Sequence, residues 1–294
     1  MLVKQITSCV IFVLMLACCG TVPVTGRRTL SLVSDTEILN SSVSQYRSFI
    51  QKAPLSTNAT TNKRVSDVGN RLVQATMQYL KDNNYGSLAE QMAWELNVVN
   101  SNAINAFCMP GGKIVVYTGI LGLIGSGVEA DAQLAAVIGH EIAHALAKHA
   151  NERISNQMLM QLGGNILGSV VGNQSATLQA VIGQAYGLGT NVFVALPFGR
   201  KQELEADKIG LVLMAMAGYD PVQAVNLWRK MAAKTGSSGQ SDFFSTHPSD
   251  ETRIAEIQKF LPEAQKYYRA RASVATPGKT TKSQGFRYET VKRP

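Results

Sequence analysis

Cysteine is scarce in this sequence, which has four cysteines among 294 residues. Cys9, Cys18 and Cys19 lie within or just after an apolar run near the start, so the body of the chain contains Cys108 alone. This count excludes a disulfide framework. We expect Cys108 to behave as a small buried hydrophobic residue.

The body of the chain also lacks an excess of charge of either sign. The formal net charge is +8, but residues 266–294 carry +7 and Lys4 carries another positive charge, so residues 18–265 sum to zero. A charged face that binds nucleic acid is therefore excluded. We predict that residues 263–294 form a basic, solvated, disordered tail, with contact to anionic lipid as the alternative.

No apolar run is long enough to span a bilayer. The run from Val10 to Leu16 is followed by Ala17, and a spanning helix needs about 20 residues. Because Lys4 precedes the run, the pattern is typical of a secretory signal. Residues 155–195 are apolar, but Asn and Gln interrupt them repeatedly, which favours buried or lid-forming helices.

The Leu-Ala-Cys-Cys sequence at the end of the signal resembles a bacterial lipobox. We predict a lipoprotein-type signal peptide at 1–17, a lipid anchor on Cys18 and a linker through residue 35. Cys19, which has Leu16 three positions before it, is the alternative lipidation site, and a plain signal peptide with incidental cysteines is another interpretation. These features predict a membrane-anchored lipoprotein in the bacterial cell envelope, with its folded domain outside the cytoplasm.

Residues 36–262 are predicted to form one mainly helical α+β domain, without internal repeats. Hydrophobic periodicity predicts helices at 36–52, 62–83, 129–153, from Pro197 to about 216, 221–234 and 250–260. It also predicts strands at 92–100 and 113–118, with a turn at 105–112 before the second strand.

The segment His140-Glu141-Ile142-Ala143-His144 has the pattern His-Glu-x-x-His within a predicted helix. Successive helical residues turn by about 100°, so the two imidazoles lie on one face and can bind one metal ion. Glu141 flanks that face, where it can act as the general base that takes a proton from water. The pattern also occurs by chance, so a further ligand has to be found.

A catalytic zinc site needs a third protein ligand and an open fourth position. His149 lies nine residues after His140, which places it on the opposite face of an uninterrupted helix. No glycine between His144 and His149 ends that helix. We therefore reject His149 as a ligand.

A pair of carboxylates downstream offers the third ligand. Glu203 and Asp207 are four residues apart and share a helical face, whereas Glu205 points away from it. We predict that Glu203 binds zinc and that Asp207 accepts the ring N–H of a ligand histidine. An exposed acidic cluster is the alternative, and the presence of the His-Glu-x-x-His pattern in the same chain argues against it.

His247 is the remaining histidine, beside Pro248 in a predicted loop. A turn residue without further role is one interpretation. The other is a catalytic role, in which His247 stabilises the developing oxyanion or occupies the open position on zinc in a resting state. A structural zinc site is disfavoured, because such sites are closed by four ligands and three are convincing here.

Together these motifs resemble the zinc metallopeptidases of the family that includes the CAAX prenyl endopeptidase and the HtpX heat-shock protease. The resemblance covers about residues 35–262 and rests on four motifs in the expected order. They are Asn105–Gly112, His140–His144, Glu203–Asp207, and Thr246-His247-Pro248 followed by Arg253. The similarity is greatest to the soluble, often lipid-anchored bacterial branch that contains LoiP and BepA, although no helical repeat domain follows residue 262.

The resemblance implies a gluzincin-type domain with a small sheet beside the active-site helix and one Zn²⁺ ion per chain. It also implies that Asn105, Ala106 and Phe107 lie on an edge strand where extended substrate adds by main-chain hydrogen bonds. The expected activity is a metalloendopeptidase that hydrolyses unfolded or misassembled envelope proteins in quality control at a bacterial membrane. The alternative is an assembly or chaperone-like binding factor with an occluded zinc site.

Overall fold

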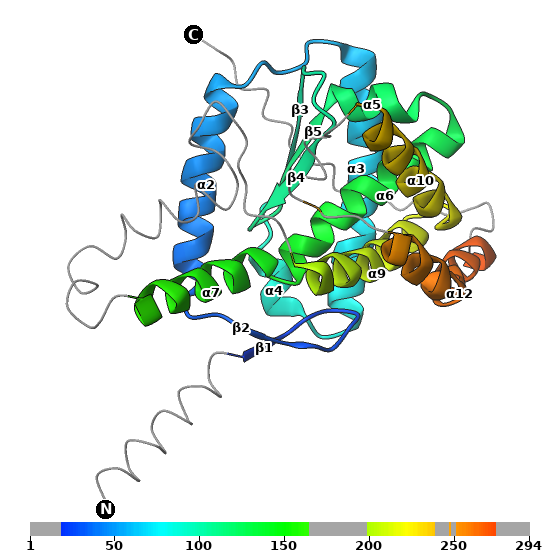
Figure 1. Ribbon diagram of the computed structural model, residues 1–294. Coiled ribbons are helices and arrows are strands. Elements are labelled where there is room, and N and C mark those ends of the chain that lie inside the picture. Colours follow the sequence, from blue (N-terminus) through cyan, green and yellow to red (C-terminus); the bar gives the residue numbers. More distant parts are fainter. Residues whose placement is uncertain (1–18, 165–198, 239–246, 248–250, 275–294) are drawn as a thin grey trace, which may run out of the picture.

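The computed structural model describes residues 19–164, 199–238, 247 and 251–274 (Figure 1). These residues are mainly helical with a small mixed sheet, so the predicted fold class is confirmed. The helices are α2 (Asp35–Lys52), α3 (Ala59–Asp82), α4 (Gly86–Glu90), α5 (Thr118–Ile124), α6 (Val128–Leu146), α7 (His149–Gly164), α9 (Arg200–Met216), α10 (Val222–Ser238) and α12 (Glu251–Val274). The strands are β1 (Cys19–Thr21), β2 (Arg28–Leu30), β3 (Glu95–Val99), β4 (Ala106–Met109) and β5 (Lys113–Tyr117).

The three-stranded sheet has the order β3-β5-β4, with β3 parallel and β4 antiparallel to the central strand β5. Every residue of β5 is buried, and alternate side chains point to opposite faces of the sheet. Ile114 and Val116 join the larger hydrophobic core, whereas Val115 and Tyr117 join a smaller core with α2. The sheet therefore lies between α2 on one face and α3 with α6 on the other (Figure 1).

Helix α6 runs through the centre of the larger core. Every residue from Ala132 to Leu146 is buried, and a helix without a polar face is stable only when it is covered on all sides. Helices α3, α9 and α10 supply that cover. The His-Glu-x-x-His segment is thus held in a rigid and water-poor part of the fold.

Helices α6 and α9 approach each other closely at Gly139 and Gly210. A Cβ atom on Gly210 would lie 2.9 Å from the backbone nitrogen of His140, and one on Gly139 would lie 3.1 Å from the carbonyl oxygen of Gly210. Glycine at this crossing lets the two backbones meet. As a result, the first two turns of α9, which carry Glu203 and Asp207, lie beside His140.

Two segments near the active-site helix differ from the sequence predictions. The helix predicted at 129–153 is divided, because Lys148 adopts a φ of +54° and separates α6 from α7. The turn predicted at 105–112 contains strand β4, which is only four residues long and whose residues, except Phe107, are buried. In so short a strand, the alternation of apolar and polar residues that would identify it in the sequence is not clear.

The two ends of the described chain also contain more regular structure than predicted. Residues 18–35, predicted as a linker, include the antiparallel pair β1–β2. The helix predicted at 250–260 continues as α12 to Val274 and passes through Pro262. Buried residues on both sides of the proline, Ile257 and Ala264, pack into the core and hold the helix together there.

Within the ranges that the structure describes, no helix has the length and apolar content needed to cross a membrane. The helices predicted at 155–195 lie mostly outside these ranges. The first part of that segment, through Gly164, belongs to α7.

Candidate metal centre

Two histidines one helical turn apart form the base of the site. His140 and His144 are both buried, and their Nε2 atoms lie 3.0 Å apart. The predicted spacing on one face of the helix therefore brings the two imidazoles to a common point.

Glu203 enters the site from α9. Its Oε1 atom lies 3.4 Å from His144 Nε2, and its Oε2 atom lies 3.4 Å from His140 Nε2. The side chain is 1% exposed, which is rare for a carboxylate without a balancing charge. Burial opposes its ionisation, but His247 and Arg253 hold the pKa of Glu203 well below its usual range.

His247 completes the cluster. Its Nδ1 atom lies 3.0 Å from Glu203 Oε1 and 3.4 Å from His140 Nε2, and the side chain is buried. The structure thus brings His247 directly to the metal-binding atoms. This position corresponds to the resting-state hypothesis, in which the histidine occupies the fourth position.

The four residues fit a single zinc ion. Zn–N bonds of about 2.0–2.1 Å in a tetrahedral site place neighbouring donors about 3.3 Å apart. Five of the six pairs of residues approach to 3.0–3.4 Å when both oxygens of Glu203 are counted, and one ligand atom from each of the four residues lies within 4.8 Å of every other.

The charge of the cavity also favours a divalent cation. Within the described ranges, three buried carboxylates, Glu141, Glu203 and Asp207, face one buried guanidinium, that of Arg253. When all four groups are ionised, the cavity carries two more negative than positive charges, and buried charges require compensation. One Zn²⁺ ion supplies that compensation.

Glu141 lies where a general base is required. It is 2% exposed, and its Oε1 atom accepts no hydrogen bond within the described part of the chain. His247 Nε2 lies 3.4 Å from this oxygen. Burial raises the pKa of Glu141, which brings a carboxylate closer to the range in which it can both accept and return a proton.

The sequence analysis did not specify which ligand histidine Asp207 contacts, and the structure shows that it is His140. The Oδ1 atom of Asp207 lies 2.9 Å from His140 Nδ1. A proton on Nδ1 is therefore shared with the carboxylate, and Nε2, which faces Glu203, is left to bind the metal. Burial opposes ionisation of Asp207, but Arg253 lowers its pKa below the usual range.

Arg253 is a site residue to which the sequence analysis assigned no role. Its Nε and Nη2 atoms donate to Asp207 Oδ2 and Oδ1 at 2.6 and 2.8 Å, and its Nη1 atom lies 2.7 Å from Glu203 Oε2. The guanidinium also lies 3.7 Å from the centre of the Trp228 ring. One signal was present in the sequence, because Arg253 falls on the same face of α12 as the apolar residue Ile257.

His149 does not point away from the site, so the helical-wheel argument about its direction was wrong. Because α6 ends at Leu146, His149 begins α7, and its Nδ1 atom lies 2.9 Å from His144 Nδ1. It lies outside the set of four potential metal ligands, so its rejection as a ligand stands as a prediction.

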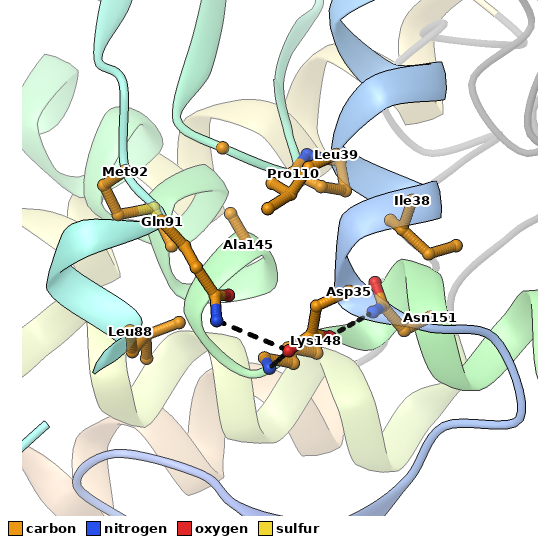
Figure 2. Close-up of a pocket in the computed structure, with 11 residues that line it drawn as sticks. Asp35, Ile38, Leu39, Leu88, Gln91, Met92, Pro110, Ala145, Lys148 and Asn151 are labelled. Carbon is orange, nitrogen blue, oxygen red and sulfur yellow. Dashed lines mark hydrogen bonds and ion pairs between the residues drawn. The ribbon is translucent and has the colours of Figure 1, made fainter.

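The turn that redirects His149 is held by polar contacts (Figure 2). Lys148 forms an ion pair with Asp35 at the start of α2, and Asn151 donates to the same carboxylate at 3.3 Å. Gln91 donates to Asp35 at 3.5 Å from the other side of a small pocket. These contacts stabilise a left-handed conformation that a lysine rarely adopts.

The predicted substrate strand lies at the edge of the sheet. Strand β4 pairs with β5 and, among the described strands, with no other, and it contacts α6. Asn105 and Ala106 are buried, whereas Phe107 packs against Phe49 with ring centres 5.5 Å apart. A role of these residues in substrate binding stays a prediction.

The predicted lipid anchor, Cys18, lies outside the described residues, and so does the end of the predicted tail from residue 275 onward. Both stay predictions. Residues 263–274, which were also assigned to the tail, are helical.

Similar proteins include the mitochondrial metalloendopeptidase OMA1 of Schizosaccharomyces pombe, which is 41% identical over 175 residues, covering 59% of this chain and 48% of the relative. The corresponding human protein is 35% identical over 183 residues, covering 60% of this chain and 34% of the relative. The beta-barrel assembly-enhancing protease of Escherichia coli is 26% identical over 237 residues, covering 78% of this chain and 44% of the relative. The chain thus spans about half or less of the length of these relatives.

These relatives overturn the predicted location. We expected a lipoprotein of the bacterial cell envelope, but the relatives of higher identity are mitochondrial proteins from plants, fungi and animals, and the bacterial proteases are more distant. The lipobox-like sequence was the basis of that prediction, and so short a pattern does not specify a compartment.

The family profile described as peptidase family M48 matches residues 61–261, which include every predicted zinc ligand, Glu141, Asp207 and His247. The match confirms the predicted enzyme class, a zinc metalloendopeptidase, and the predicted cofactor, one zinc ion. The chain belongs to peptidase family M48.

Proposed function

We propose that this protein hydrolyses internal peptide bonds of unfolded or misassembled proteins, with a zinc ion held by His140, His144 and Glu203. The observation that supports these ligands is the meeting of two imidazoles and one carboxylate from separate helices at donor distances of 3.0–3.4 Å. A buried carboxylate beside them, Glu141, supplies the base that hydrolysis needs.

When bound, zinc polarises the scissile carbonyl and lowers the pKa of the attacking water. Glu141 accepts a proton from that water and passes it to the amine that leaves as the peptide bond breaks. Asp207 keeps the Nδ1 proton of His140, and Arg253 holds the Asp207 carboxylate in place. The surrounding core excludes bulk water, which strengthens each of these contacts.

Extended substrate is proposed to bind along β4. An antiparallel segment added to this edge forms main-chain hydrogen bonds with few requirements on side chains. That mode of binding suits an enzyme that acts on many unfolded proteins. Such an activity agrees with the names of the relatives, a metalloendopeptidase and a beta-barrel assembly-enhancing protease.

One observation favours an alternative function. His247 Nδ1 lies among the donor atoms, so in this arrangement it would fill the fourth position of a zinc ion held by the other three residues. A chain that keeps this position filled would act as an assembly or chaperone-like binding factor with an occluded zinc site. For a peptidase, His247 must move aside when substrate binds.

Casein digestion by the full chain tests the proposal. We expect cleavage that stops when zinc is removed with a chelator and returns when zinc is added back. Glu141→Gln should retain zinc and lose cleavage, whereas Glu129→Gln, an exposed position on the same helix, should leave both unchanged. If Glu141→Gln fully corrects a biological defect caused by loss of the protein, the protein acts instead as the assembly or chaperone-like binding factor.

A further inference from the structure

A chain of buried hydrogen bonds leads away from His144 on the side opposite to the metal-binding atoms. His144 Nδ1 lies 2.9 Å from His149 Nδ1, and His149 Nε2 lies 2.9 Å from Glu205 Oε2. His149 is fully buried, and Glu205 is 7% exposed. The catalytic mechanism uses neither residue.

The hairpin formed by β1 and β2 closes the far end of this chain. Thr25 Oγ1 donates to Glu205 Oε1, and Arg27 Nε donates to Glu205 Oε2 at 2.8 Å. Arg27 also forms an ion pair with Glu152 on α7. Each oxygen of Glu205 therefore has a fixed partner, and the carboxylate cannot rotate without breaking one of these contacts.

Metal binding at His144 Nε2 sets the direction of every hydrogen bond in the chain. The neutral imidazole then carries its proton on Nδ1, so His144 donates and His149 Nδ1 accepts. His149 must carry its own proton on Nε2, from which it donates to Glu205. With the metal on His144 Nε2, only this arrangement of protons gives both hydrogen bonds of His149 one donor and one acceptor.

We propose that His149 is a positioning residue for the zinc ligand His144, and that Glu205, held by the β1–β2 hairpin, fixes the orientation of His149. This inference rests on the proposed zinc site. In this arrangement each ligand histidine is supported by a carboxylate of α9. Asp207 contacts His140 directly, and Glu205 contacts His149, which in turn contacts His144. Partners of this kind orient the ring of a metal ligand and raise its basicity.

Zinc affinity of the full chain, purified in detergent, tests the inference by competition with a chromophoric chelator. His149→Leu removes both hydrogen bonds, and we expect about 10- to 100-fold weaker zinc binding. The visible spectrum of the Co²⁺-substituted protein should also change, because His144 is released from its fixed orientation. Gln133→Leu is the matched control. Gln133 lies on the same helix as the ligand histidines, and its buried side chain also makes two hydrogen bonds.

Two further variants separate positioning from a general loss of folding. His149→Gln provides an acceptor and a donor again and should recover part of the zinc affinity. Arg27→Met changes a half-exposed side chain on the hairpin, so it leaves the core intact and should weaken zinc binding by a smaller factor. Thermal unfolding of each metal-free variant shows whether the fold itself has changed.

The inference fails if His149→Leu and Arg27→Met fold, bind zinc as the wild type does and show its Co²⁺ spectrum, while His144→Ala loses the metal. If the wild type binds no zinc, or if His144→Ala retains it, the proposed metal site fails as well. These two failures are therefore distinguishable.

Discussion

Replacing Arg253 by methionine removes the guanidinium that, among the residues the structure describes, faces the buried carboxylates of the site. Methionine keeps an apolar stem of similar length, so the packing against Trp228 is largely retained. Asp207 loses both donors of a bidentate contact, and Glu203 loses an ion pair at 2.7 Å. The substitution thus isolates the electrostatic contribution of the arginine.

The expected loss follows from the burial of these groups. Arg253 is 2% exposed and Asp207 is 6% exposed, so water does not replace the lost partner. Removing one partner of a buried ion pair costs about 3–5 kcal/mol. We expect this full loss in the metal-free protein and a smaller loss with zinc bound, because the metal then balances Glu203.

Urea unfolding followed by far-UV circular dichroism measures the change, once with chelator and once with zinc. Arg71→Met is the matched control. That arginine also stacks on an aromatic ring, Tyr219 at 4.0 Å, and donates to a carbonyl oxygen, but it is exposed and forms no ion pair with a carboxylate in the described part of the chain. Its replacement should cost no more than about 1 kcal/mol.

A loss of less than about 1 kcal/mol for metal-free Arg253→Met would refute the reasoning, because a buried carboxylate that has lost its cation should destabilise the fold by more than that. Equal losses with and without zinc would refute the second part, namely that the metal and the guanidinium share the charge of Glu203.

Two further predictions concern helix α9. Gly210→Ala should destabilise the fold by about 1–3 kcal/mol and weaken zinc binding, because the new Cβ atom meets the His140 backbone at 2.9 Å. Gly122→Ala, whose Cβ atom meets nothing within 4 Å, should be neutral or slightly stabilising in the same urea and chelator assays. Glu205 should make stability depend on pH: burial opposes ionisation, but hydrogen bonds from His149, Arg27 and Thr25 lower its pKa from 4.5 to about 2. Its contribution, on the order of 2 kcal/mol, is then complete above about pH 4.5 and lost as the pH falls toward 2, so the stability advantage of the wild type over Glu205→Gln should shrink across that range. An advantage that stayed constant with pH would contradict this assignment.

The residues that meet at the candidate metal centre could be predicted because their geometry is local. His140 and His144 are related by one helical turn, and so are Glu203 and Asp207, so each pair follows from helix geometry alone. Only the meeting of the two helices had to be assumed. The crossing at Gly139 and Gly210 provides it, and no periodicity in the sequence marks those glycines as contacts.

Arg253 could not be assigned in the same way, because these contacts lie on two other helices. Asp207 and Glu203 are on α9, and Trp228 is on α10. A lone arginine in a helical pattern is ordinarily exposed. Its place after Thr246-His247-Pro248 in the family motif and its register with the buried residue Ile257 set it apart, but neither feature identifies its partners.

His149 shows where reasoning from helix periodicity fails. The rotation of about 100° per residue holds only while the helix continues. Lys148 breaks it with a φ of +54°, a conformation that costs a non-glycine residue roughly 1 kcal/mol and that no sequence rule assigns to lysine. The ion pair between Lys148 and Asp35, a residue more than a hundred positions earlier, offsets that cost. A contact distant in sequence therefore decides the direction of His149, and with it whether His144 has a hydrogen-bonding partner behind it.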